Sequence, residues 1–305
     1  MTSAGARLRT LIEAPEITVL PGVHDTLSAL IAQSCGAKAI AAGGYSATAS
    51  LLGRPDSSQL SLTELGDYYA RMADRIDIPI LADGDTGFGN VTNVARTVRV
   101  LERTGVGGFF IEDQVFPKRC GHMAGKAVIG VEEMAGKLKA ALDARQRDTI
   151  IMARTDAIAT HGFDEALDRM QLYHEIGVDL LFIEAPTDID QVRKIPAALA
   201  GPCMVNLIDG GSTPLLSAAE YQEMGYAACA MPVTATHAVV KALQTFYGDL
   251  LKNGDLRQAM HHGVGFEAYT DLVGLPEQRS AEQAYLDQAR ALMQRGLGGD
   301  ETKTV

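Results

Sequence analysis

Eight short apolar runs recur along the chain, and stretches with helical periodicity separate them. Each run is almost continuously hydrophobic, which is typical of parallel strands that are buried on both faces. Several of the intervening stretches end in a glycine that suits a helix C-terminus, such as Gly105 and Gly177. The runs span residues 17–21, 39–42, 78–82, 108–111, 149–153, 180–183, 203–206 and 227–231.

A strand followed by a helix, repeated eight times in single file, predicts an α/β fold, a (β/α)8 TIM-type barrel. The length of 305 residues would also allow two domains, but barrels of this kind often occupy such a length as one. We expect residues 1–305 to form a single barrel domain, with the polar, helical residues 254–305 as a C-terminal extension. A doubly wound parallel sheet is the alternative architecture.

The charge balance restricts the class of partner. A net charge of −11 argues against nucleic acid or an anionic membrane, because such partners need a basic surface. The four cysteines are widely scattered with no metal-ligand spacing, so free thiols in a reducing compartment are expected. The N-terminus lacks the long apolar core of a signal peptide, which predicts a cytoplasmic protein.

Polar residues follow the predicted strands at the points where the strands end. Barrel enzymes carry their active sites at the carboxyl ends of the strands, so these residues are expected to meet at one mouth. Most of them are acidic. In chain order they are Asp83-Gly84-Asp85, Glu112-Asp113, Arg154-Thr155-Asp156, Glu184 and Asn206.

The carboxylates Asp83, Asp85, Glu112 and Asp56 indicate a metal site. Carboxylates that converge repel one another unless a cation or a proton offsets their charge. Oxygen ligands without a histidine or thiolate cluster favour Mg²⁺, or alternatively Mn²⁺, over zinc. The competing interpretation is that Asp83 and Asp85 merely cap the helix expected near Val91.

The pentapeptide Lys118-Arg119-Cys120-Gly121-His122 places two cations and an imidazole around a thiol. Such surroundings lower the pKa of a cysteine and make Cys120 a candidate proton donor or nucleophile. A solvated basic loop with an incidental cysteine is the alternative.

These motifs, in this order after the third, fourth and fifth strands, resemble those of the isocitrate lyase/phosphoenolpyruvate mutase superfamily from about residue 19 to residue 275. The resemblance implies a modified TIM barrel whose last helix is swapped between subunits, in a homotetramer. Residues 280–295 would contribute to such contacts. It also implies a small di- or tricarboxylate substrate.

The same resemblance assigns roles to individual residues. Asp83 would ligate Mg²⁺, and Asp56, Asp85 and Glu112 would hold its waters, with Glu112 also counted in the catalytic set. Arg154 would bind the reacting carboxylate or oxyanion. The gate segment, residues 116–127, would carry the catalytic side chains Lys118, Arg119, Cys120 and His122 over the substrate. The substrate-binding residues would be Gly43, Gly44, Tyr45, Gly121, Glu184 and Asn206.

Cys120 places the chain in the lyase branch by resemblance, because the phosphonate-forming mutases typically lack this cysteine. Cleavage of a carbon–carbon bond next to a carboxylate leaves an enolate that must be protonated, whereas a phosphoryl shift needs no such acid. We therefore expect an oxo-acid-lyase type of enzyme that uses Mg²⁺ in retro-aldol or retro-Claisen cleavage of a 2-hydroxy or 2-oxo acid.

Three departures from the family pattern bear on the substrate. Gly43 stands where relatives often have serine, and Leu207-Ile208 stands where tricarboxylate lyases offer a hydroxyl. Gly265 or Phe266 aligns with an arginine of methylisocitrate lyases. A less polar site favours a dicarboxylate similar to 2,3-dimethylmalate, since an unpaired third carboxylate is costly to bury. The alternatives are a 2-methylisocitrate lyase, an oxaloacetate hydrolase or decarboxylase, a phosphonopyruvate or carboxyphosphonoenolpyruvate-type mutase, and a non-catalytic carboxylate-binding protein.

Overall fold

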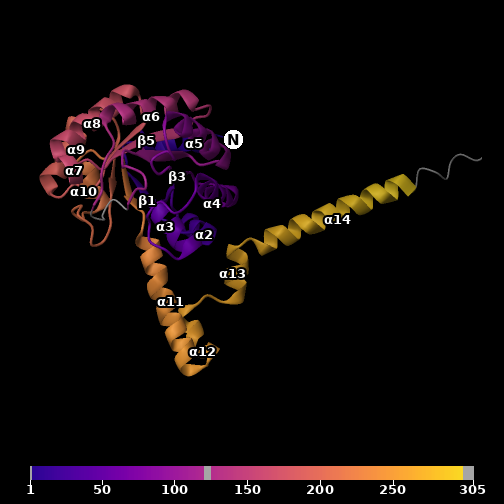
Figure 1. Ribbon diagram of the computed structural model, residues 1–305. Coiled ribbons are helices and arrows are strands. Elements are labelled where there is room, and N and C mark those ends of the chain that lie inside the picture. Colours follow the sequence, from indigo (N-terminus) through magenta and orange to yellow (C-terminus); the bar gives the residue numbers. More distant parts are fainter. Residues whose placement is uncertain (1, 120–124, 298–305) are drawn as a thin grey trace, which may run out of the picture. The chain divides into compact units, whose positions relative to one another are not determined.

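A barrel of eight parallel strands dominates the computed structural model, which describes residues 2–119 and 125–297 (Figure 1). Neighbouring strands pair in the order β1-β8-β7-β6-β5-β4-β3-β2, and a parallel bridge between Gly22 and Ala41 joins the two ends of that order. The (β/α)8 prediction is confirmed, and the doubly wound alternative is wrong. The strands are β1 Thr18–Pro21, β2 Ile40–Ala42, β3 Ile80–Asp83, β4 Gly108–Glu112, β5 Ile150–Thr155, β6 Leu180–Ile183, β7 Cys203–Asn206 and β8 Ala228–Met231.

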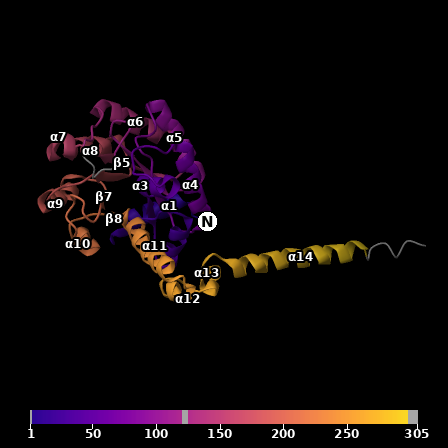
Figure 2. The ribbon, with the colours of Figure 1, turned by 60° about the horizontal axis from the view of Figure 1, so that its bottom comes forward.

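Helices surround the strands, as both views of the barrel show (Figures 1 and 2). Several begin with a side-chain cap that satisfies backbone N–H groups, such as Ser61 and Asn90. The helices up to the last strand are α1 Ala4–Ile12, α2 Thr26–Ser34, α3 Gly44–Leu52, α4 Leu62–Arg75, α5 Val91–Thr104, α6 Val131–Ala144, α7 Ile158–His161, α8 Phe163–Ile176, α9 Ile189–Ala198 and α10 Ala218–Glu223.

The strands are continuously hydrophobic because both of their faces are buried in separate cores. In β5, Met152 packs in the inner cluster of the barrel, whereas its neighbours Ile151 and Ala153 pack in the outer cluster with the helices. Phe182 and Ile183 of β6 divide between the two clusters in the same way. This is the two-residue period of a strand, with an apolar core on each side.

Helix α1 packs against the strands at their amino ends. Leu8 is fully buried in the inner cluster, and Arg9 Nη2 lies 2.7 Å from an oxygen of Asp179, which directly precedes β6. Gly108 permits this close approach at the start of β4. A Cβ atom there would lie 2.7 Å from Ile150 Cβ and 3.1 Å from Leu8 Cδ2. Because α1 covers the amino ends of strands, the active site is expected at the carboxyl ends.

The chain divides into two compact units, residues 1–240 and residues 241–305. The described part of the second unit is helical and contains the end of α11 Thr234–Asn253, then α12 Leu256–Ala259, a 3-10 turn at Met260–His262, α13 Phe266–Leu272 and α14 Leu275–Leu297 (Figure 2). Tyr285, Leu286 and Leu292 of α14 are exposed apolar side chains. In the described residues, every helix is too short or too polar to cross a bilayer. The predicted extent of the domain and the swapped last helix stay predictions.

Candidate active site

The polar residues predicted at the strand ends do meet at one mouth of the barrel. Asp83 ends β3, Glu112 ends β4, and Arg154 is near the end of β5. All three side chains are buried. A cavity opens here, and the predicted site residues that line it are Gly43, Gly44, Tyr45, Asp56, Asp83, Lys118, Arg154, Glu184 and Asn206.

Asp83 is held by two backbone N–H groups. Gly44 N–H, at the start of α3, donates to Asp83 Oδ2 over 2.8 Å, and Asp85 N–H donates to Asp83 Oδ1 over 2.8 Å. The amide of Gly44, which was predicted for the substrate, therefore already has a partner within the protein. A Cβ atom at Gly44 would lie 2.9 Å from Asp83 Oδ2, so a larger residue there would displace that carboxylate.

Lys118 lies within the acidic cluster formed by Asp56, Asp83, Asp85 and Glu112. Its Nζ is 2.8 Å from Asp56 Oδ2 and 3.8 Å from Asp83 Oδ2, and its side chain is 3% exposed. Burial opposes its charge, but the four carboxylates outweigh burial and raise the pKa of Lys118 well above its usual value. Lys118 is thus a buried ammonium and not part of a solvated basic loop.

Ser58 and Gln114 hold the backbone of the gate segment, and the sequence prediction missed both. Lys118 N–H donates to Ser58 Oγ over 2.9 Å. The side chain of Gln114 bonds to both backbone groups of Arg119. Gln114 Nε2 donates to Arg119 O over 2.9 Å, and Arg119 N–H donates to Gln114 Oε1 over 3.1 Å. Val115 N–H donates to Ala127 O over 2.8 Å, which closes the neck of the segment.

The remaining predicted residues of the gate segment divide into two groups. The Arg119 side chain is exposed and lies near Gly125, where a Cβ atom would be 2.7 Å from Arg119 Nη1. Cys120, Gly121 and His122 lie outside the described residues. Their predicted roles therefore stay predictions.

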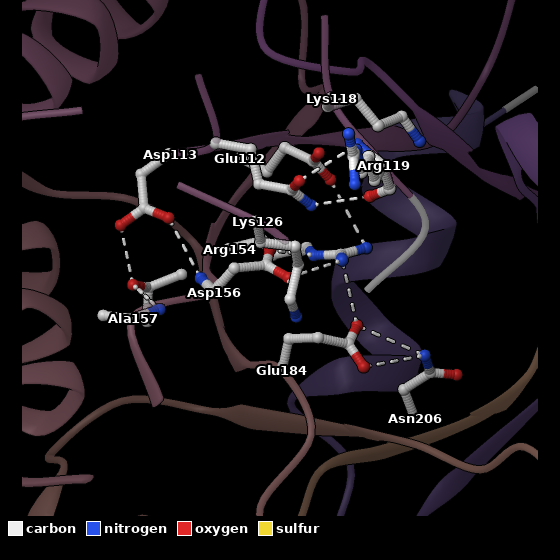
Figure 3. A network of polar contacts seen from close by, with 12 residues as sticks. Glu112, Asp113, Lys118, Arg119, Lys126, Arg154, Asp156, Ala157, Glu184 and Asn206 are labelled. Carbon is white, nitrogen blue, oxygen red and sulfur yellow. Dashed lines mark hydrogen bonds and ion pairs between the residues drawn. The ribbon is translucent and has the colours of Figure 1, made fainter. Parts of the chain in front are cut away.

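Arg154 projects among three carboxylates (Figure 3). Its Nε and Nη2 donate to Asp156 over 2.9 Å and 3.1 Å, while Glu112 and Glu184 lie at 3.4 Å and 3.3 Å. The rings of Phe110 and Phe182 lie beside the guanidinium, with centroids 5.6 Å and 5.4 Å from Cζ. These contacts fix the plane of Arg154, as is required of a group that binds a carboxylate in a defined orientation.

A second layer of polar contacts lies behind Arg154 and involves residues to which the sequence prediction gave no role. Asp113 accepts a hydrogen bond from Asp156 N–H at 2.9 Å (Figure 3). It also accepts hydrogen bonds from Thr155 Oγ1 at 2.6 Å and from Arg169 Nη1 at 3.1 Å. Asp156 also pairs with Lys126 at 2.9 Å, so it connects Arg154 to the far end of the gate segment. Asp113 and Asp156 directly follow predicted strands, and this position in the sequence could have indicated a role at the site. Arg169, in α8, has no such position.

The charges of the site do not balance among the described residues. Three cations, Lys118, Lys126 and Arg154, are paired with carboxylates of a larger set. That set consists of Asp56, Asp83, Asp85, Glu112, Asp156 and Glu184.

The pKa values of the carboxyl groups reflect this surplus of negative charge. Burial, with the neighbouring Asp83 and Asp56 carboxylates, raises the pKa of Asp85 to about 6, although Lys118 opposes the shift. Burial also raises the pKa of Glu112 well above its usual value, against the effect of Arg154. Asp156 is different, because Arg154 and Lys126 overcome its burial and lower its pKa. The cluster around Asp85 and Glu112 therefore has room for another positive charge.

The acidic cluster suits a hard divalent cation. Glu112 is fully buried, and neither of its carboxylate oxygens has a hydrogen-bond partner among the described residues. Within residues 2–119 and 125–297, no three acidic, histidine or cysteine side chains converge closely enough to chelate one ion. This arrangement fits Mg²⁺, which usually takes one or two carboxylates directly and keeps several waters.

The fold and the site together define a barrel enzyme with a buried carboxylate cluster and a buried arginine at its mouth. Comparison with known families is consistent with this class, since residues 8–251 match the family described as phosphoenolpyruvate phosphomutase. The chain belongs to that family, which confirms the resemblance seen in its motifs.

Relatives with different activities have similar identity to this chain. It is 39% identical to 2,3-dimethylmalate lyase of Eubacterium barkeri over 93% of this chain and 98% of the relative. It is 39% identical to 2-methylisocitrate lyase of Aeropyrum pernix, over 91% and 90% of the two chains. It is 40% identical to carboxyvinyl-carboxyphosphonate phosphorylmutase of Arabidopsis thaliana, over 94% and 86%. The chain is an enzyme of this family, and lyases are among its named relatives.

Solved structures that are similar to this chain also include enzymes with different activities. Oxaloacetate acetylhydrolase in complex with 3,3-difluorooxalacetate is similar with a TM-score of 0.89 and 31% identity, over 93% of this chain and 97% of that one. Phosphonopyruvate hydrolase in complex with oxalate and Mg²⁺ is similar with a TM-score of 0.84 and 27% identity, over 93% and 100%. Members of this group act on small carboxylates, and one of these complexes contains Mg²⁺.

Proposed function

We propose that this protein is a Mg²⁺-dependent carbon–carbon lyase that cleaves a 2-hydroxy or 2-oxo dicarboxylate, with a 2,3-dimethylmalate-like substrate favoured. The main support is the position of Arg154, a buried and oriented guanidinium that lines the cavity beside the acidic cluster. An anionic substrate can use Arg154 for one carboxylate only if a further cation offsets the surrounding carboxylates. A divalent ion at Asp83 meets that need.

The metal would be held by Asp83, with Asp56, Asp85 and Glu112 binding its waters. When bound, the ion would polarise the substrate oxygen next to the bond that breaks. Arg154 orients the substrate carboxylate, and Asn206 offers an amide at the rim of the cavity. The Cys120 thiol, with Lys118, Arg119 and His122 around it in sequence, would deliver its proton to the carbon of the enolate that cleavage leaves.

The lining of the cavity supports a dicarboxylate with alkyl substituents. Ile208, Pro232 and Val233 are apolar residues that line the cavity together with Asn206. Among the described residues, the cations that line the cavity are Lys118 and Arg154, and Lys118 is already paired with Asp56. One carboxylate on Arg154 and one near the metal would use the available positive charge. A third carboxylate would face apolar side chains, at a cost in desolvation.

The test is a substrate comparison with purified enzyme and Mg²⁺. We expect 2,3-dimethylmalate to be cleaved fastest, ahead of 2-methylisocitrate, oxaloacetate and phosphonopyruvate, with each product identified by NMR. EDTA should abolish turnover, and Arg154→Met should reduce kcat/KM by roughly 100-fold or more because the substrate carboxylate loses its partner. Fast turnover of 2-methylisocitrate alone would contradict the dicarboxylate proposal, and turnover of phosphonopyruvate alone would favour a mutase or hydrolase.

Assembly and location belong to the same proposal. A homotetramer with its last helix exchanged between subunits would cover the exposed apolar side chains of α14, such as Leu286 and Leu292. A cytoplasmic location is supported by Cys203 and Cys229, which are buried free thiols. Burial raises the pKa of Cys203 to about 12, so this thiol is a core residue and not a reactive one.

A further inference from the structure

The ammonium of Lys118 lies where the acidic cluster would hold a metal ion. It is 2.8 Å from Asp56 Oδ2 and 3.8 Å from Asp83 Oδ2, and Asp83 is the proposed direct ligand. The carboxylates of Asp85 and Glu112 also act on its charge. A single side-chain cation therefore interacts with all four residues of the cluster.

The backbone of Lys118 is fixed while its side chain reaches into the cluster. Ser58 holds its N–H at 2.9 Å, and Gln114 holds the next residue through both backbone groups. Asp56 and Ser58 are two residues apart, so one short segment binds both the backbone N–H and the ammonium of Lys118.

A divalent ion on Asp83 would lie close to this ammonium. Two cations at such a distance repel each other strongly in a buried site, where water screens their charges little. Binding of the ion therefore requires Lys118 to withdraw or requires an additional anion between the two cations. A dianionic substrate supplies such an anion.

We propose that Lys118 is an internal counter-cation that competes with the divalent ion for the acidic cluster, so that the ion binds tightly only together with an anionic substrate. The proposal rests on the metal site of the proposed function. It assigns to Lys118 a regulatory effect on metal affinity, separate from any part that the residue plays in turnover.

The test measures Mn²⁺ affinity of the full-length protein by electron paramagnetic resonance, with and without oxalate as a dianionic probe. Lys118→Met should bind Mn²⁺ about tenfold or more tightly than wild type when oxalate is absent. Lys118→Arg keeps the charge and should bind as wild type does. Oxalate should increase the Mn²⁺ affinity of wild type by a larger factor than that of Lys118→Met.

Lys126→Met is the matched control, because Lys126 is also 3% exposed and pairs with one aspartate at 2.9 Å, at the other end of the gate segment. It should leave Mn²⁺ affinity unchanged. Equal or weaker Mn²⁺ binding by Lys118→Met would overturn the competition, and so would the same increase in Lys126→Met. Failure of every variant, wild type included, to bind Mn²⁺ would contradict the metal site itself and this inference with it.

Discussion

At the scale of single residues, the site depends on how each charge is held. Arg154 is oriented by Asp156, which is oriented in turn by Asp113 and Arg169 behind it. This chain of contacts brings a guanidinium to the cavity in one orientation, although three carboxylates compete for it. Asp156 keeps its charge because two cations lower its pKa, whereas Asp85 and Glu112 are more easily protonated.

Asp156→Asn tests whether Asp156 holds the Arg154 guanidinium in its orientation. The substitution leaves Arg154 and Lys126 without their shared carboxylate in a buried position, so the free energy of unfolding should fall by about 3 kcal/mol. Loss of orientation at Arg154 should reduce kcat/KM by about 100-fold. Urea unfolding and steady-state kinetics measure the two effects. The control is Asp143→Asn, whose exposed pair with Lys139 should contribute less than about 0.5 kcal/mol. Similar losses of stability and of kcat/KM in both variants would contradict the role of Asp156 in orienting Arg154.

Asp85 makes the stability of the metal-free protein depend on pH. Its pKa is raised from 3.8 to about 6, so the folded protein retains a proton that the unfolded chain loses first. The free energy of unfolding should therefore fall as pH rises from about 4 to about 6, by roughly 3 kcal/mol from this group. Above and below that window, Asp85 adds no further change.

Asp85→Asn should remove that part of the decline. Urea unfolding of both proteins in EDTA, from pH 4 to pH 7, should show the variant gaining stability relative to wild type as pH increases. Parallel profiles for the two proteins would show that Asp85 titrates normally in the folded state.

At the scale of elements, the gate segment is the part whose anchoring the structure explains. Its neck is closed by the Val115–Ala127 backbone bond, its first half is held by Ser58 and Gln114, and Lys126 ties its far end to Asp156. Gln114 and Asp156 closely follow β4 and β5, and Ser58 lies on the loop between α3 and α4. Such anchoring is what the proposed role of this segment as a gate over the substrate requires.

Gln114→Ala removes two of these anchors while leaving the barrel intact. We expect kcat to fall about tenfold and trypsin cleavage after Lys118 or Arg119, followed by mass spectrometry, to become several-fold faster. The control is Gln171→Ala, which removes an exposed side-chain hydrogen bond to Glu175. An unchanged cleavage rate in Gln114→Ala would mean that Gln114 does not hold the gate segment.

The elements also show what the sequence can predict. All eight apolar runs coincide with strands, because burial on both faces leaves an uninterrupted pattern that needs no knowledge of neighbours. The positions of Asp83, Glu112 and Arg154 follow from the same pattern, since they lie at or next to the ends of those strands. Ser58, Gln114 and Arg169 gave no such signal. Their roles arise from contacts with Lys118, Arg119 and Asp113 that only the folded chain creates.

At the scale of the whole molecule, the helical second unit carries large apolar side chains that are exposed to solvent in a single chain. Tyr285, Leu286 and Leu292 are all more than half exposed on α14, at 72%, 54% and 67%. Exposed apolar side chains grouped in this way mark interaction surfaces. The barrel, by contrast, has complete inner and outer cores within residues 1–240.

Introducing charge on α14 tests the proposed assembly. Four chains of 32.5 kDa give an expected mass of about 130 kDa in light scattering after size-exclusion chromatography. Leu286→Glu combined with Leu292→Glu should lower that mass, because a buried charge without a partner is costly. Gln294→Glu, about 180° around the same helix from Tyr285, is the control and should leave it unchanged. A monomeric wild-type protein would contradict the homotetramer.

We propose that this enzyme breaks a carbon–carbon bond and then protonates the carbon that is released. Retro-aldol cleavage of 2,3-dimethylmalate between its second and third carbons gives pyruvate and propionate. NMR of the Mg²⁺-loaded enzyme in D₂O should show pyruvate together with propionate that carries one deuterium at its second carbon. Cys120→Ser should abolish this signal while oxalate binding is retained. Absence of cleavage for every dicarboxylate tested would contradict the proposed lyase activity, and unchanged turnover by Cys120→Ser would contradict the proposed role of Cys120 as the proton donor.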